Sequence, residues 1–431
     1  MICDGDGAAP GRIRPEPAKR ICGLPAAVGT LVLLFLLSAT TRAGADQTYP
    51  GLAAADLPRM LDIEWSRGPD LPQGFQDSEA VVLGTRLVTV CGFCSGRDDA
   101  KKPGKYPRGF LKKGWWIDLA RPDAKWEPLP DFPGVARQGL VGAAAGGSLY
   151  VWGGFNYDAP YCYADGYRLS LQGGAWRWDP LPPLPYPLCA MAMSAVGSRI
   201  FLFAGADYDS ERFYTASDRA GKHPRMGAQL WEFDTRNPAE GWRLRAECPG
   251  TPRWVCAMAA VRGRLYVIGG ATGDVPGVGY CTVVDNWAYE IASDRWTRLA
   301  DLPISSGNFP KGPSAFRGRF ILLPGGYQYA RVANPDGTFR APYGTPTKVE
   351  GKGEYFGDVF VYDTVTGKFG TADTMPINNN LSTTLVHGDE IILLGGEADA
   401  RELGGVYYGH HPDLFLRGRL RVSGRHPAQK P

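Results

Sequence analysis

Histidine is scarce in this chain. Five occur in 431 residues: His223, His387, His410, His411 and His426. They form no His-x-x-x-His pair, and the nine cysteines show no four-ligand zinc spacing. The sequence therefore predicts neither a metal centre nor a cofactor. His410 and His411 precede an outer strand, and we expect the histidines to be either solvated or strand-end residues.

An excess of either charge is also missing. The chain has 47 Lys and Arg against 44 Asp and Glu, a formal net charge of +3. A protein that binds nucleic acid or an anionic membrane surface usually carries a basic patch or excess. This balance favours neither partner.

Long hydrophobic runs are absent, apart from residues 24–39. Arg12, Arg14, Lys19 and Arg20 precede this run, and Ala43-Gly44-Ala45 follows it as a small-x-small cleavage site. We expect residues 1–45 to be a signal peptide and residues 46–431 to be exported, to the periplasm or the extracellular space. The alternative is an uncleaved N-terminal membrane anchor, for which the run is short.

The chain does contain a repeat. In Val261–Gly270 an apolar run turns over on a glycine, and a second run ends in a glycine pair. A tryptophan strand that closes in Leu-Pro follows about thirty residues later, at Arg295–Pro303. Six copies start roughly 50 to 70 residues apart, a period typical of propellers. The sequence predicts an all-β, six-bladed β-propeller.

The first and last repeats are incomplete. Ile63–Pro72 has the pattern of a fourth strand with no first three strands before it, and the last repeat lacks its fourth strand. We expect the strand at residues 62–72 to complete the sixth blade, which would close the ring and remove an unpaired edge.

Loop lengths indicate which face is functional. The turns between first and second strands are minimal and contain glycine, as in Arg262-Gly263. The connections between second and third strands are long in every repeat, and in such blades they emerge on one face, where long loops usually carry function. These loops are residues 94–114, 156–165, 207–227, 272–284, 327–357 and 397–412. They are rich in tyrosine, Tyr327 included, which suits binding of sugars or of protein surfaces.

Two sets of positions are expected near the central channel. The first lies where the chain enters each innermost strand and would form a ring rich in hydrogen-bond donors. It contains Gly74, Arg137, Pro187, Arg253, Asn308 and Asn378. The second set follows each glycine pair and contains Phe93, Phe155, Ala206, Ala271, Gly326 and Glu397. Glu397 is the only ionisable residue there, so it is the candidate acid or base, with Arg401 as its partner. The alternative is a purely structural salt bridge.

Cysteine contributes little to the functional prediction. Cys91-Gly92-Phe93-Cys94 has redox spacing but lies at a glycine-pair position, so a local disulfide or two small buried side chains are expected. Cys189 and Cys256 precede Ala-Met-Ala in successive repeats and are expected to be small core residues, with Cys162 within reach of Cys189 as an alternative.

Three features of this repeat resemble the Kelch repeat. They are the glycine pairs, third strands of the type Trp231–Asp234, and fourth strands that end in Leu-Pro after a Trp-x-x-Leu pattern, as at Trp126–Pro130 and Trp296–Pro303. Among Kelch proteins, an exported six-bladed ring is similar to bacterial N-acetylneuraminate epimerases, which interconvert sialic acid anomers. Phe132–Gln138 resembles that family's entry to its second blade, and Ile392–Glu397 resembles its last blade.

The resemblance implies a catalytic glutamate after the glycine pair of the fourth blade. This chain has Ala271 there, and Asp274 nearby is the candidate replacement. The galactose oxidases, another Kelch branch, hold copper on seven blades with two tyrosines and two histidines. In this chain His223 and His410 would have to be the two histidines that bind copper.

The sequence thus predicts a propeller that holds a small carbohydrate or sugar acid on its long-loop face. As an enzyme it would open and reclose a sugar ring, with Glu397 as acid or base. The other residues assigned to this site are Arg137 and Arg253 as clamps, Asp207 or Asp274 as second carboxylate, and Asn308, Asn378, Arg401 and Tyr327 as ligand-binding residues. The competing hypothesis is a non-catalytic module that binds a glycan or a protein partner.

Overall fold

The computed structural model describes residues 51–97, 103–158, 160–207, 225–275, 278–309, 315–349 and 353–424. Contacts divide the chain into residues 1–45 and residues 46–431, and the fold described below belongs to the second unit. Its described elements are β-strands and two short 3-10 helices, η1 (Ala54–Asp56) and η2 (Pro238–Glu240). Among these described residues, no helix has the length and hydrophobicity that crossing a membrane requires.

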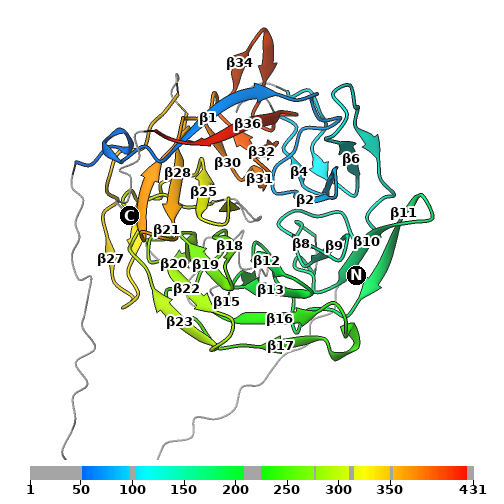
Figure 1. Cartoon of the computed structure of the whole chain (residues 1–431), viewed down its shortest axis with the longest axis horizontal. Helices are drawn as coiled ribbons and strands as arrows, with labels where there is room; N and C mark the ends of the chain where they lie inside the picture. The colour runs from blue at the N-terminus through cyan, green and yellow to red at the C-terminus, as the bar shows by residue number, and fades with distance from the viewer. Residues whose placement is uncertain are drawn as a thin grey trace, which may run out of the picture. The chain divides into compact units, whose positions relative to one another are not determined.

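Six four-stranded antiparallel sheets form the blades of a propeller (Figure 1). Blade one contains β2 (Glu79–Leu83), β3 (Arg86–Val90), β6 (Gly114–Asp118) and β7 (Glu127–Pro128). Blade two contains β8 (Val141–Ala145), β9 (Ser148–Trp152), β10 (Gly166–Gln172) and β11 (Ala175–Leu181). Blade three contains β12 (Ala192–Val196), β13 (Arg199–Phe203), β16 (Leu230–Asp234) and β17 (Trp242–Leu244). Blade four contains β18 (Ala257–Val261), β19 (Arg264–Ile268), β22 (Trp287–Glu290) and β23 (Arg295–Arg298). Blade five contains β24 (Ala315–Phe316), β25 (Phe320–Pro324), β28 (Val359–Asp363) and β29 (Lys368–Thr371). Blade six contains β31 (Thr383–His387), β32 (Glu390–Leu394), β36 (Phe415–Val422) and β1 (Leu61–Arg67).

The innermost strands contact one another in a closed circle. The sequence of contacts runs from β2 through β8, β12, β18, β24 and β31 and back to β2. Three of these strands, β8, β12 and β18, are rich in alanine, as in the Val-Gly-Ala-Ala-Ala of β8, because neighbouring blades approach most closely near the axis.

The sixth blade is built from both ends of the chain. β1 pairs antiparallel with β36 along its whole length, from Leu61 opposite Val422 to Arg67 opposite Leu416. Figure 1 shows the two strands side by side, β1 in blue and β36 in red. The strand ends at Arg67, before the Gly68-Pro69 pair, so it is shorter than the predicted 62–72.

The recurring tryptophan joins neighbouring blades. Trp126 Nε1 donates a hydrogen bond to the carbonyl of Pro69 at 2.9 Å, and Trp178 Nε1 donates to Pro130 at 3.1 Å. Trp296 Nε1 donates to the carbonyl of Ala246 at 2.7 Å. In each case the indole N–H of one blade donates to a backbone carbonyl at the end of the outermost strand of the preceding blade. This contact explains why the tryptophan recurs in successive repeats.

The glycine pairs share one backbone conformation. The first residue has φ near +60° and the second has a larger positive φ, for example 57° at Gly395 and 109° at Gly396. Cys91 and Ala204 occupy the first position, but every second position is glycine. In blade five the pair is Gly325-Gly326, with φ 71° and 126°. This corrects the sequence alignment by one residue, because Tyr327 and not Gly326 follows that pair.

The long connections form small strand pairs of their own. In blade one these are β4 (Phe93–Cys94) and β5 (Gly109–Phe110), and in blade three β14 (Ala206–Asp207) and β15 (Arg225–Met226). A further sheet contains β20 (Ala271–Val275), β21 (Gly279–Val283), β26 (Val332–Ala333) and β27 (Phe339–Arg340). In blade six β30 (Asn379–Asn380) pairs with β33 (Glu397–Ala398), and β34 (Arg401–Leu403) pairs with β35 (Val406–Tyr408).

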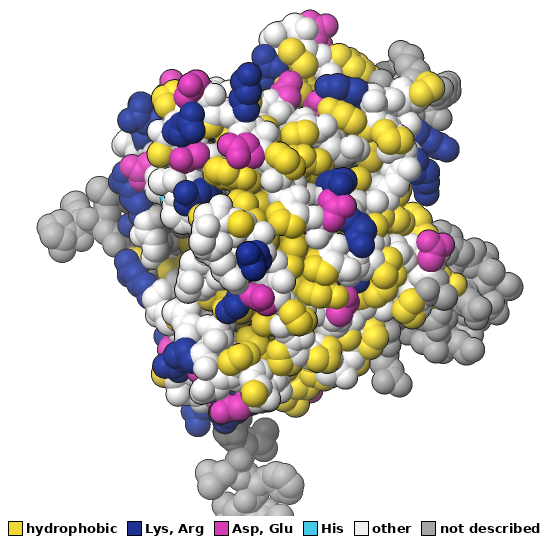
Figure 2. Space-filling model, turned by 90° about the vertical axis from the view of Figure 1, so that its right-hand side faces the viewer, with side chains coloured by type: hydrophobic (Ala, Val, Ile, Leu, Met, Phe, Trp, Pro, Cys, Tyr) yellow, Lys and Arg dark blue, Asp and Glu magenta, His cyan; other side chains and the backbone are white. Residues whose placement is uncertain are grey.

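The outer rim carries both charges around apolar side chains. Figure 2 shows hydrophobic side chains in a broad band, with basic and acidic side chains scattered around it. A shallow groove of about 580 Å³ is lined by Trp116 and Trp176, whose ring centroids lie 6.1 Å apart.

All seven cysteines in the described residues are buried. Cys256 is 0% exposed and packs in the hydrophobic core between blades three and four, which confirms its prediction as a small core residue. Burial raises the pKa of the Cys91 thiol to about 12. A thiol held protonated in this way is not a nucleophile at neutral pH.

Asp358 provides a stability prediction. Its side chain is 3% exposed, and burial raises its pKa from 3.8 to about 6, although the backbone N–H of Thr347 donates to its Oδ2 at 2.6 Å. The fold therefore favours the protonated acid. That stabilisation is complete below pH 3.8 and is lost as the pH rises to about 6. Asp358→Asn is expected to stabilise the protein by about 2–3 kcal/mol at pH 7.5 and to have little effect at pH 3.5. Thermal melts of both proteins at the two pH values measure this; equal melting temperatures at pH 7.5 contradict it.

Candidate active site

Backbone hydrogen bonds link successive blades, from blade six through blades one, two and three to blade four, where the chain enters the innermost strands. Asp77, Gly139, Ala190 and Val255 each donate their N–H to the carbonyl of the preceding blade's residue, at 3.3, 3.1, 2.8 and 2.9 Å. These residues have positive φ, as do Asn308 and Leu381 at the corresponding points of blades five and six.

The residue before each of these turns pairs with the residue that follows a glycine pair. The pairs are Gln76 with Phe93, Gln138 with Phe155, Cys189 with Ala206, Trp254 with Ala271, Gly307 with Tyr327 and Asn380 with Glu397. The six positions proposed from the sequence, Gly74 to Asn378, are not structurally equivalent and do not form the expected donor ring. Spacing to the hairpin glycine could not reveal this, because that glycine is the first residue of some hairpin turns and the second of others, as in Gly84-Thr85 and Arg262-Gly263.

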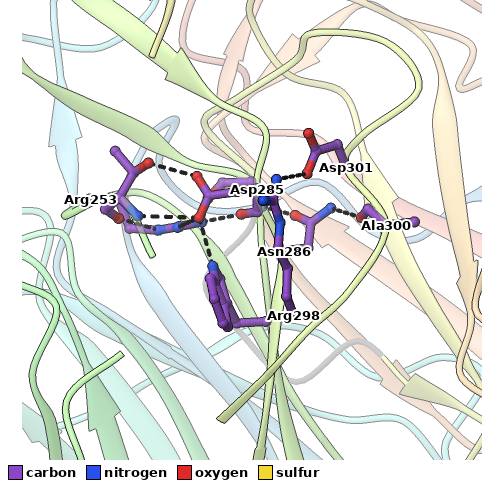
Figure 3. A network of polar contacts seen from close by, with 9 residues as sticks. Arg253, Asp285, Asn286, Arg298, Ala300 and Asp301 are labelled. Atoms are coloured by element: carbon purple, nitrogen blue, oxygen red, sulfur yellow. Dashed lines mark hydrogen bonds and ion pairs between the residues drawn. The ribbon is translucent and has the colours of Figure 1, made fainter. Parts of the chain in front are cut away.

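Arg253 lies in the scaffold of blade four (Figure 3). It is 0% exposed, and its NH2 donates to Asp285 Oδ2 at 2.5 Å. Its remaining N–H groups donate to the carbonyls of Thr251, Gly269 and Asp285 at 2.8, 3.2 and 2.6 Å. Every part of the guanidinium is thus bound within its own blade.

Arg137 repeats this arrangement in blade two. It is 0% exposed, donates to the carbonyls of Val135 and Gly153, and pairs with Asp165 at 2.6 Å. We therefore assign both arginines a structural role, holding the glycine pair of their blades, in place of the ligand clamp that the sequence suggested. The sequence could not separate the two roles, because both require an arginine at the start of the innermost strand.

Glu397 lies at the channel end of blade six, in β33. It is half-buried, and its Oε2 accepts hydrogen bonds from Asn380 Nδ2 at 3.1 Å and from the Tyr355 hydroxyl at 3.3 Å. Burial and the nearby Asp77 carboxylate raise the pKa of Glu397 to about 7, and the two hydrogen bonds oppose this shift. A carboxyl group that titrates near neutral pH can donate or accept a proton under physiological conditions.

Tyrosines surround Glu397. The ring of Tyr327 lies 4.8 Å from that of Tyr329 and 6.3 Å from that of Tyr355. Burial and the charges of Glu354 and Glu397 raise the pKa of Tyr327, so its hydroxyl stays protonated. Asn308, a predicted ligand-binding residue, exchanges hydrogen bonds with the Tyr329 hydroxyl at 3.0 and 3.1 Å. The structure thus brings Glu397, Tyr327 and Asn308 into one region.

Two histidines complete this region, which the sequence predicted to be solvated or strand-end residues. One ring nitrogen of His410, one of His411 and a carboxylate oxygen of Glu397 all lie within 4.8 Å of one another. His411 is only 6% exposed, so of the two alternatives it is a strand-end residue before β36 and not a solvated one. Burial lowers the pKa of His411 to about 3 and also lowers the pKa of His410. Both imidazoles are therefore neutral at pH 7.

These three side chains could be taken for a metal site, but the hydrogen bonding of His411 argues otherwise. The backbone N–H of Ser95 donates to His411 Nδ1 at 2.6 Å. In a neutral imidazole this places the proton on Nε2, so neither ring nitrogen offers a lone pair to a cation. Nε2 is buried and has no hydrogen-bond partner among the described residues. The His411 ring is better suited to donate a hydrogen bond than to ligate a metal.

A cation lies at the rim beside the histidines. The exposed Arg108 guanidinium lies 5.1 Å from the ring centroid of Phe93 and 5.9 Å from that of Tyr157, and its charge contributes to the low pKa of His411. Within the described part of the chain Arg108 forms no ion pair. A cavity of about 300 Å³ next to His411 is lined by Tyr106, Tyr407 and Asp413 among others.

Of the other predicted site residues, two make structural hydrogen bonds, and two have side chains outside the described residues. Asn378 is 2% exposed and donates to the carbonyl of Val349 and to Asp399 Oδ2, so it fixes the loop of blade five. Arg401 donates to the carbonyl of Pro376 at 2.9 Å. Asp207 and Asp274 lie on the backbone of β14 and β20, but their side chains are outside the described residues, as is His223.

Sequence reasoning missed Arg108, His410, His411 and Asp77. Arg108, His410 and His411 lie in connections of irregular length, so no repeat position marks them. Asp77 lies at the repeated turn before the innermost strand, a position that the sequence analysis did not use. The adjacent histidines directly before a blade-six strand were the one available signal.

Comparison with known proteins agrees with this architecture. A model of the Kelch motif matches residues 256–303. The N-acetylneuraminate epimerase of Haemophilus influenzae (strain 86-028NP) is 22% identical over 357 residues, covering 77% of this chain and 88% of the relative. That of Salmonella arizonae is 24% identical over 354 residues, covering 72% and 88%. A solved structure described as "Structure of YjhT" aligns with a TM-score of 0.54 at 14% identity, covering 79% of this chain and 94% of that one. The chain folds as a β-propeller, contains a Kelch motif at residues 256–303 and resembles the N-acetylneuraminate epimerases.

Proposed function

We propose that this protein is exported and catalyses the interconversion of sugar-acid anomers at the channel mouth beside Glu397. The observation that carries the proposal is a half-buried glutamate whose pKa is raised to about 7, surrounded by tyrosines. The similarity to N-acetylneuraminate epimerases supports the substrate class. The hydrophobic leader at residues 24–39 supports export.

The geometry fits ring opening and reclosure. Protonated Glu397 donates its proton to the ring oxygen while the anomeric hydroxyl loses one, the bond between the ring oxygen and the anomeric carbon breaks, and a carbonyl forms. After rotation the ring closes on the other face, and both protons return. Asn380 and Tyr355 hold the carboxyl group in place for this transfer.

Tyrosine rings provide apolar faces against which a sugar ring packs. Arg108, with its exposed guanidinium, is placed to bind the carboxylate of the substrate, the role first assigned to Arg137 and Arg253. The resemblance implies a glutamate after the glycine pair of blade four, where this chain has Ala271. In this proposal the acid of blade six performs that chemistry instead.

The test is the rate of anomer re-equilibration of N-acetylneuraminate, followed by proton NMR with and without the protein. We expect acceleration that saturates with substrate, and a much smaller effect on the methyl ester, which lacks the charge that Arg108 would bind. Arg108→Gln should raise the KM for the acid and leave that for the ester nearly unchanged. No acceleration of either compound would refute the enzymatic function.

A non-catalytic binding module is the second candidate, favoured by the alanine at position 271. It predicts saturable binding of the sugar acid, seen as line broadening of the ligand signals, without any change in the anomer exchange rate.

A further inference from the structure

The three aromatic rings next to Glu397 form a stack. The His410 ring lies 4.5 Å from the His411 ring with 26° between their planes, and 6.3 Å from the Tyr355 ring with 24° between their planes. The stack fixes the orientation of His410, a half-buried residue beside the acid.

His410 has one nitrogen free to accept a proton. A hydrogen bond with the backbone of Ala398 favours its N–H form at one nitrogen. Because the ring is neutral, the other nitrogen carries a lone pair. Apart from the backbone of Ala398, the His410 ring has no hydrogen-bond or salt-bridge partner among the described residues.

The distances among the His410, His411 and Glu397 atoms allow all three side chains to act at one carbon of the substrate. Three atoms that lie within 4.8 Å of one another can all be reached from one oxygen at about 2.8 Å, the length of a normal hydrogen bond. The anomeric hydroxyl and the ring oxygen of a sugar are bonded to the same carbon, so both fit between Glu397 and the two imidazoles. His411, with its proton on Nε2, adds a donor at the same place.

We propose that His410 is the general base that acts opposite Glu397, the general acid, in the ring opening. This inference rests on the function proposed above. The His410 lone pair takes the proton of the anomeric hydroxyl, the electrons of that O–H bond form the carbonyl, and the bond to the ring oxygen breaks. The ring oxygen keeps that electron pair and takes the proton of Glu397. On reclosure the hydroxyl that re-forms the ring gives its proton to Glu397, and His410 gives its proton back to the carbonyl oxygen. Both residues return to their starting states, so no oxidant, metal or cofactor is needed.

The acid and base should appear as two limbs of the pH profile. The rate should fall above pH 7 as Glu397 loses its proton, and below the lowered pKa of His410 as the imidazole gains one. The charged and titratable groups that act on this pair are Asp77, Glu354, Tyr355, Asp399, His411 and, through His411, Arg108.

Two variants test the base. His410→Phe keeps an aromatic ring in the stack but has no lone pair, and His410→Ala leaves space for a small molecule. Both are expected to lower kcat about 100-fold or more and to lose the acidic limb of the profile. Added imidazole should restore part of the activity of the alanine variant and none of that of the phenylalanine variant. His387→Ala, at an exposed hairpin, is the matched control and should behave as wild type.

The outcomes separate the two proposals. If wild type accelerates the reaction and His410→Phe retains most of that rate, the base is not His410 while the mutarotase function stands. A rate loss that imidazole does not rescue, with the acidic limb unchanged, would reduce His410 to a structural role. If wild type gives no acceleration, both proposals fall.

Discussion

Glu397→Gln is expected to slow anomer interconversion about 100- to 10,000-fold, the range that loss of a general acid or base typically produces. Glutamine keeps the size and the hydrogen bond from Asn380, but it has no proton to transfer. The loss should appear in kcat with little change in KM, because the acid acts on the transition state. Proton NMR of the two anomers measures both constants.

The folded protein should tolerate this change. A carboxyl group whose pKa is raised from 4.5 to about 7 is preferred in its neutral form, so the stabilisation is present below pH 4.5 and is lost as the pH rises through 7. Glutamine resembles the neutral acid, and the variant should be at least as stable as wild type at pH 8. Glu402→Gln, an exposed carboxylate in β34, is the matched control and should retain full activity. Equal rates for Glu397→Gln and wild type would remove Glu397 from the mechanism.

Asp285→Ala is expected to destabilise the protein by about 3–5 kcal/mol, since it leaves the fully buried Arg253 without its counter-ion. Asp285 also accepts hydrogen bonds from Thr251 Oγ1 and Trp287 Nε1, both at 2.7 Å, and those donors would lose their partner (Figure 3). Chemical denaturation followed by tryptophan fluorescence measures the change.

The double variant Arg253→Met/Asp285→Leu sharpens this test. Replacing a buried ion pair by apolar side chains is often nearly neutral. Here the carbonyls of Thr251, Gly269 and Asp285 would lose their donors, so we expect the double variant to remain clearly less stable than wild type. Asp389→Ala, which breaks the exposed pair with Arg317, is the control and should change stability by at most about 1 kcal/mol. A similarly small effect of Asp285→Ala would contradict the structural role given to Arg253.

The repeat made most of the fold predictable. Two-residue turns, glycine pairs and a recurring tryptophan are local patterns that each copy repeats, so blade number and strand order follow from counting. The departure in blade five came from Pro324, which precedes its glycine pair and shifted the alignment by one residue.

The candidate site was predictable only in part. Glu397 stood out because it is the one carboxylate among the residues that follow the glycine pairs. Arg137 and Arg253 were misassigned because a buried arginine that binds backbone carbonyls and an exposed arginine that binds a ligand have the same sequence signature.

The sequence by itself determined the blades, the long-loop face and the one acid at the channel mouth, because hydrophobic periodicity and turn chemistry act over short stretches of chain. Only the tertiary structure decided which groups meet that acid. Asp77 comes from blade one, Tyr355 from the loop of blade five and His410 from that of blade six. Their approach depends on how irregular loops fold over a closed ring, and the resulting burial is what raises the pKa of Glu397 and lowers those of the two histidines.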